Sequence, residues 1–100
     1  DNRNAQMQFI MDIYKDTKSP VFLCGDLNSV PESDAIKLLD QHFKRTCVEN
    51  CANTVPQINP RRVIDYIATK NLNWSVIDYQ VIAETYASDH RPISATFQIK

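Results

Sequence analysis

The sequence predicts an α/β domain, and three features of its apolar pattern support this fold class. An amphipathic helix is expected over residues 4–15, a continuously apolar strand over residues 21–24, and a final strand over residues 93–99, where apolar and polar residues alternate. A helix that leads into a strand covered on both faces is typical of α/β proteins. The 100 residues, 43% of them hydrophobic and 23% charged, suffice for one small domain with a core.

The first helix is expected to bury one apolar stripe, formed by Phe9, Ile10, Ile13 and Tyr14. Lys18-Ser19-Pro20 ends that helix, and the polar residues 29–34 provide the turn and cap of a second helix that ends near His42. Strands are also expected over residues 63–69 and 75–83, with a turn at residues 70–73. The tally is four strands and two helices.

Residues 43–60 carry no periodic pattern and are expected to form a long loop, either on the substrate side or as an ordinary surface excursion. Cys47 and Cys51 lie in this loop with the spacing Cys-x-x-x-Cys. They can form a disulfide in an oxidising compartment, or offer two thiolates to a metal, although a structural zinc site needs four ligands. Cys24 lies inside an apolar run and is expected to be buried and inert.

The net charge and the length of the apolar runs say little about what the protein binds or where it is located. Eleven Lys and Arg against twelve Asp and Glu give a net charge of -1, so no basic excess points to nucleic acid or an anionic membrane. No apolar run approaches the roughly 20 residues of a membrane span, and no targeting segment is present in the chain, which leaves a cytoplasmic, secreted or periplasmic location open. The absence of an initiator Met leads us to expect a processed or truncated chain.

Four polar residues stand where strands are expected to run or to end. Asp65 lies inside an apolar strand, where an ionised carboxylate is costly unless it is paired, either with Arg61 or Arg62 or with a histidine from another strand. His90, just before the last strand, is the candidate histidine. Asp26 and Asn28 are two residues apart, so on an extended chain their side chains project from the same face, as ligands at a strand end require.

Gly25, the only glycine, precedes Asp26 and is expected to leave room for a ligand or another backbone. Taken alone, Gly25 to Asn28 favours an ordinary turn, and Ser88-Asp89-His90 favours turn or cap residues. Together the strand-end residues supply three carboxylates, one carboxamide and one imidazole. Oxygen-rich acidic clusters of this kind suit Mg²⁺, which bridges protein carboxylates to phosphate oxygens during phosphoester hydrolysis.

These motifs resemble those of the endonuclease/exonuclease/phosphatase superfamily, also called the DNase I-like fold. Its Gly-Asp-[Leu/Phe]-Asn motif is matched by Gly25 to Asn28, its Arg-hydrophobic-Asp-Tyr-hydrophobic strand by Arg62 to Ile67, and its Ser-Asp-His turn by Ser88 to His90. Here two residues, not one, separate the arginine from Asp65, so the match to this motif covers Asp65 to Ile67 and not the arginine.

The resemblance implies a role for each matched residue. Asp26 would orient or activate the attacking water and Asn28 would hold the phosphoryl group. Asp89, with Asp26, would bind Mg²⁺ or Mn²⁺. His90 would contact the scissile phosphate or act as general acid or base, and Asp65 would fix the tautomer of its ring.

The resemblance also implies a fold, one sheet-plus-helices half of a four-layer α/β/β/α sandwich. Residues 1–100 would be the C-terminal half, and the N-terminal half, which carries an Asn, a metal-binding Glu and a His in the family, has no counterpart in this chain. The segment alone is therefore expected to be inactive and to leave apolar strand faces bare.

The intact protein is expected to be a Mg²⁺- or Mn²⁺-dependent phosphomonoesterase or phosphodiesterase. Its substrate is expected to be a small-molecule, sugar or lipid-headgroup phosphate. A non-catalytic binding module and a nuclease are the alternatives. The nuclease is disfavoured because the sequence has no stripe of Lys and Arg that would contact nucleic-acid phosphates.

Overall fold

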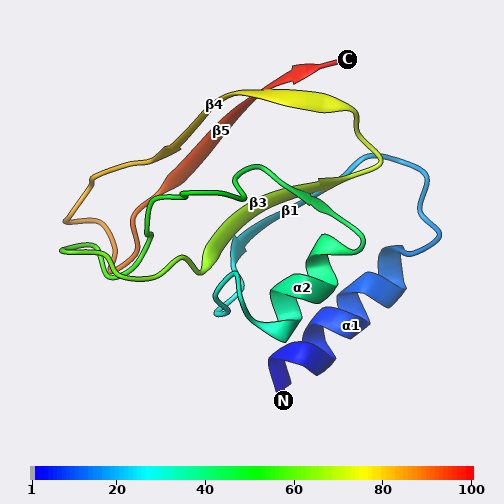
Figure 1. Cartoon of the computed structure of the whole chain (residues 1–100), viewed down its shortest axis with the longest axis horizontal. Helices are drawn as coiled ribbons and strands as arrows, with labels where there is room; N and C mark the ends of the chain where they lie inside the picture. Colours follow the sequence, from blue (N-terminus) through cyan, green and yellow to red (C-terminus); the bar gives the residue numbers. More distant parts are fainter. Residues whose placement is uncertain (1) are drawn as a thin grey trace.

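The computed structural model describes residues 2–100, and it contains two helices and five strands in that range. The helices α1 (Asn2–Tyr14) and α2 (Asp34–Asp40) lie together on one side of the strands β1 and β3, while the long hairpin of β4 and β5 extends away on the other side (Figure 1). The mixed α/β class predicted from the sequence is confirmed. None of the helices in residues 2–100 is both long and apolar enough to cross a membrane.

Helix α1 is where it was predicted, but it buries a different face. Met7 and Met11 are 4% and 2% exposed and enter the core, whereas Phe9 and Ile13 are 67% and 54% exposed. Met7 and Met11 are four residues apart and therefore lie on one side of the helix, with Ile10 packed beside them. The predicted stripe was wrong for Phe9 and Ile13 and right for Ile10, because two apolar stripes fit the same helical period and packing against α2 selects the one with the methionines.

Helix α2 is short and is fixed at both ends. Ser33 is its N-cap, and its hydroxyl accepts a hydrogen bond from the amide of Ile36 at 3.3 Å. Near the other end, Arg45 forms two hydrogen bonds with the carboxylate of Asp40, at 2.7 and 2.9 Å. Between these ends Ile36 and Leu39 are fully buried in the core.

The sheet beneath the helices is antiparallel, with the strand order β1-β3-β2. Its strands are β1 (Val21–Asp26), β3 (Asp65–Lys70) and the two-residue β2 (Lys44–Arg45). Strand β2 lies inside the predicted loop and was not predicted, because two residues are too few to show a period. The remaining loop is partly ordered by the disulfide Cys47–Cys51 and by a bridge between Val55 and Arg62.

Strand β1 differs from the prediction that both its faces are covered. It lies at the edge of the three-stranded sheet, and its Val21 and Leu23 pack toward the core while Phe22 is 52% exposed. Cys24 is a free thiol and is exposed, so the expectation that it is buried was also wrong. The physical reason is that the helices cover only one face of this sheet within residues 2–100.

The second sheet is the antiparallel hairpin of β4 (Trp74–Val81) and β5 (Ile93–Ile99), with a register shift between Val76 and Asp78. An aromatic contact joins it to the first sheet, because the ring of Phe97 packs edge-on against Phe22 of β1 at a centroid distance of 5.8 Å. Within the hairpin, the same ring packs edge-on against Trp74 at 4.9 Å. The hairpin therefore carries the segment that precedes β5 back toward the end of β1 and β3 (Figure 1).

Candidate active site

The candidate site begins with the register of β1 and β3. In this antiparallel pair Asp26 lies directly opposite Asp65, as the last residue of one strand and the first of the other. Two carboxylates at opposite positions of a ladder repel each other and destabilise the pair unless a cation or a proton lies between them. The strand pairing thus creates a local demand for positive charge.

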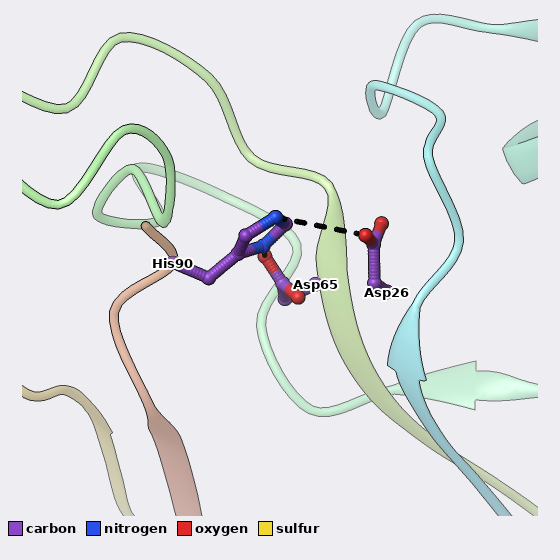
Figure 2. Close-up of side chains that lie close together, drawn as sticks. All are labelled: Asp26, Asp65 and His90. Atoms are coloured by element: carbon purple, nitrogen blue, oxygen red, sulfur yellow. Dashed lines mark hydrogen bonds and ion pairs between the residues drawn. The ribbon is translucent and has the colours of Figure 1, made fainter. Parts of the chain in front are cut away.

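His90 meets this demand. Its Nδ1 lies 2.8 Å from Oδ2 of Asp65, and its Nε2 lies 3.7 Å from Oδ2 of Asp26, so the ring stands between the two carboxylates (Figure 2). The backbone around it is held as well: the His90 amide donates to the hydroxyl of Ser88 at 3.0 Å, and the Arg91 amide donates to the carbonyl of Thr54 at 2.7 Å. Of the two partners considered for Asp65, the structure has the histidine.

The electrostatics follow from this geometry. The pKa of His90 is raised, first because of the hydrogen bond to Asp65 and then because of the charges of Asp65, Asp26 and Asp89, while partial burial opposes the rise. The side chain of His90 is a quarter exposed, so solvent reaches the ring. With Nδ1–H donating to Asp65, Nε2 is the nitrogen that faces Asp26 and that can exchange a proton with a bound molecule.

Thr54 completes the support of Asp65, and nothing in the sequence had pointed to it. It is fully buried, and its hydroxyl donates to Oδ2 of Asp65 at 2.7 Å. The hydroxyl oxygen of Thr54 in turn accepts a hydrogen bond from the amide of Ile64 at 3.2 Å. Asp65 Oδ2 therefore receives hydrogen bonds from a threonine and a histidine at once. A threonine in a polar, aperiodic stretch carries no local signal of such a contact.

Asp26 and Asn28 are held differently from the prediction. Oδ1 of Asp26 accepts the amide of Asn28 at 2.7 Å, and Asn28 has a φ of 51°, so the chain turns at this point and is not extended. Asn28 lines a cavity of about 270 Å³ that also includes Ser29 and Arg62. Within residues 2–100 no hydrogen bond joins its side chain to His90.

Gly25 has a conformational role here. Its φ of 132° is one that residues with a Cβ rarely adopt, but a Cβ at this position would meet no atom within 4 Å. The expected close approach of another group to Gly25 is therefore not found among the described residues. This positive φ lies one residue before the end of β1 at Asp26.

Two hydrogen bonds join the loop that follows β1 to β3 and to the residue before it. The hydroxyl of the buried Tyr66 donates to the carbonyl of Ser29 at 2.6 Å, and the amide of Leu27 donates to the carbonyl of Ile64 at 2.9 Å. Burial raises the pKa of Tyr66 well above its usual value, so the phenol stays a neutral donor. These two bonds fix the position of the segment from Asp26 to Ser29 relative to Asp65.

A divalent cation fits this donor set in part. One ligand atom each from Asp26, Asp65 and His90 lie within 4.8 Å of one another, and Asp89 is not in this group. Asp65 and His90 are hydrogen-bonded to each other, whereas the side chain of Asp26 is 46% exposed and, among residues 2–100, its Oδ2 has only the ion pair with His90 Nε2 at 3.7 Å. Because Mg²⁺ is usually held by one or two carboxylates together with waters and substrate phosphates, Asp26 is the residue of the group that fits as its ligand.

The comparison with protein families decides where the chain belongs. The profile of the Endonuclease/Exonuclease/phosphatase family matches residues 1–90. The chain belongs to this family. No curated protein in the comparison matches the chain.

Two solved structures share the fold of this family member. One is a conserved protein of unknown function from Enterococcus faecalis, with a TM-score of 0.80 and 24% identity, and 98% of the chain covers 44% of it. The other is a mannosyl-6-phosphatase from Bacteroides thetaiotaomicron, with a TM-score of 0.71 and 15% identity, and 97% of the chain covers 44% of it. The chain thus spans less than half the length of either structure, and the predicted half of a DNase I-like sandwich is confirmed.

Proposed function

We propose that the full-length protein containing this chain is a metal-dependent phosphoester hydrolase, with a sugar phosphate or another small phosphomonoester as its substrate. The observation that carries the proposal is His90 between the carboxylates of Asp65 and Asp26, with the ring orientation fixed through Nδ1. The family supports hydrolysis of phosphoesters, and the name of the mannosyl-6-phosphatase neighbour supports a small sugar substrate.

In this proposal each residue that contacts water or substrate acts through a side-chain atom that is not hydrogen-bonded to another of the residues that the structure describes. Asp26 orients the attacking water with Oδ2, since Oδ1 is occupied by the amide of Asn28. His90 contacts the phosphoryl group through Nε2, and when protonated it gives that proton to the leaving oxygen as the ester P–O bond breaks. Asp65 holds the ring and stabilises its positive charge, and the carboxamide of Asn28 donates to a phosphoryl oxygen.

The metal would supply charge neutralisation of the phosphate oxygens when bound. Asp26 and, as a proposal from the family motif, Asp89 would hold Mg²⁺ or Mn²⁺. We also propose that residues 1–100 are the C-terminal half of the domain and that an N-terminal half completes the site. The coverage of 44% of the two solved structures supports this, as does the exposed face of β1 with Phe22 and Cys24.

The test compares two histidine variants of the full-length protein. His90→Gln is expected to lower kcat with a sugar phosphate by about 10²–10⁴-fold, the range typical of general acid–base catalysis, while His42→Gln, at an exposed position, is expected to retain wild-type turnover. Addition of EDTA is expected to stop turnover and Mg²⁺ or Mn²⁺ to restore it. Equal activity of the two variants would refute the assignment, and the absence of turnover with any phosphoester would favour a binding module.

A further inference from the structure

A groove runs from Asn28 past Arg62 to the disulfide loop. The cavity of about 270 Å³ at Asn28 and a second cavity of about 450 Å³ share Val30 and Arg62 in their walls. The two cavities therefore adjoin at Arg62. Asn28, which lines the first cavity, follows Asp26 by two residues, whereas the second cavity lies on the side of the disulfide loop.

Arg62 is fixed in its backbone and unpaired in its side chain. Its carbonyl accepts the amides of Thr54 and Val55 at 2.8 and 3.2 Å, and its amide donates to the carbonyl of Val55 at 3.1 Å. Its side chain is exposed, and across residues 2–100 no hydrogen bond or ion pair engages the guanidinium group. An anchored arginine with free donors is suited to a planar or tetrahedral oxyanion, since its fork binds two oxygens at once.

The guanidinium group of Arg62 belongs to a residue close to the reaction centre but outside it. Arg62 precedes Asp65 by three residues, so their Cα atoms are at most roughly 11 Å apart. The adjacent Thr54 links the two, since its amide binds Arg62 while its hydroxyl binds Asp65. Arg62 is therefore held in register with the site but faces a cavity that extends beyond Asn28.

The wall facing Arg62 is also fixed. Val48, Asn50 and Cys51 line the second cavity, and the disulfide Cys47–Cys51 closes the short loop that carries them. Glu32 and Asp34 also line the groove and offset part of its positive charge. Arg62 is the arginine common to both cavities.

We propose that Arg62 is a specificity-determining residue that binds a second anionic group of the substrate, a phosphate or a carboxylate, beyond the scissile phosphate. This inference rests on the proposed function for the identity of the reaction centre. Arg61, the neighbouring residue, lines only the outer cavities and offers a matched control.

The test measures equilibrium binding by calorimetry to the full-length protein in EDTA, where no turnover is expected. The probes are a hexose 6-phosphate and the matching hexose 1,6-bisphosphate at low ionic strength, since an exposed arginine is screened by salt. The wild-type protein is expected to bind the bisphosphate about 10-fold more tightly, in keeping with one charge-assisted contact. Arg62→Gln is expected to remove this preference, Arg62→Lys to restore part of it, and Arg61→Gln to retain it.

No preference in the wild-type protein, or a preference that persists in Arg62→Gln, would overturn the inference. An equal loss of affinity for both probes in Arg62→Gln would also overturn it, because Arg62 would then bind the scissile phosphate itself. Turnover with added metal is a separate measurement. Hydrolysis of either probe without a binding preference would support the proposed function and contradict the role of Arg62. A binding preference without hydrolysis would support the role of Arg62 and contradict the proposed function.

Discussion

Replacement of Thr54 by valine is expected to weaken both the fold and the control of His90. Valine has the shape of threonine but no hydroxyl, so the hydrogen bond to Asp65 is lost and the amide of Ile64 is left without its acceptor. A hydrogen bond to a charged group contributes about 1.5–3 kcal/mol, and an unsatisfied buried amide costs about 1–3 kcal/mol. We expect the free energy of unfolding to fall by about 3 kcal/mol, which a domain of ordinary stability survives.

The same change is expected to raise the pKa of His90 further. The lost hydroxyl donated to Oδ2 of Asp65, the oxygen that also faces Nδ1 of His90, so its removal leaves more negative charge next to the imidazolium. Denaturant unfolding measures the stability, and NMR titration of the histidine ring protons in EDTA measures the pKa. The His90 signals are assigned by their absence in His90→Gln.

Thr46→Val is the matched control for this experiment. The hydroxyl of Thr46 donates to the carbonyl of Ile67 at 2.9 Å in the same sheet and has no contact with Asp65. We expect a stability loss of about 1 kcal/mol and no change in the pKa of His90. An unchanged or lowered pKa of His90 in Thr54→Val would show that Thr54 does not tune the pair.

Two further predictions concern stability and accessibility. Because the folded-state pKa of His90 is raised above its unfolded value of 6.5, its stabilising contribution is fully present below pH 6.5 and is lost as the pH rises through the raised pKa. In EDTA, the free energy of unfolding is therefore expected to decline across this range in the wild-type protein more steeply than in His90→Gln, and parallel curves would contradict the assignment. If an N-terminal half covers β1, Cys24 in the full-length native protein is expected to react with iodoacetamide far more slowly than in denaturant, whereas equal rates would show that this face is open.

Sequence patterns predict this structure where the signal is local. Strand β5 and the capped helix α2 follow from the alternation of apolar residues and from the cap at Ser33. Helix α1 was correctly predicted as a helix, but its buried face depends on packing against α2, which favours Met7 and Met11. Strand β2 exists only through its pairing with β3, and two residues cannot show that in their own sequence.

In the candidate site too, the contacts with a local sequence signal could be predicted and those set by the fold could not. A buried carboxylate needs a positively charged partner or a hydrogen-bond donor, so a partner for Asp65 could be predicted. His90 was one of the two alternatives, and Arg61 or Arg62 was the other. Thr54 could not be predicted, since its contact with Asp65 is set by the path of an aperiodic loop. A turn at Gly25 to Asn28 was one of two alternatives, and the φ of 51° at Asn28 shows that the chain turns there, whereas the extended geometry assumed for Asp26 and Asn28 was wrong.

The opposition of Asp26 and Asp65 has a consequence for the folding pathway. Asp65 and His90 are 25 residues apart in sequence, and the β1–β3 ladder brings Asp26 opposite Asp65. A slip of that ladder by one residue would turn the Asp26 side chain to the other face of the sheet, while most backbone hydrogen bonds could still form. Such a chain could have native secondary structure and no site. If the full-length protein has the proposed hydrolase activity, that activity is, more than circular dichroism, the sensitive reporter of correct strand register, and we expect its recovery to be among the last events during refolding.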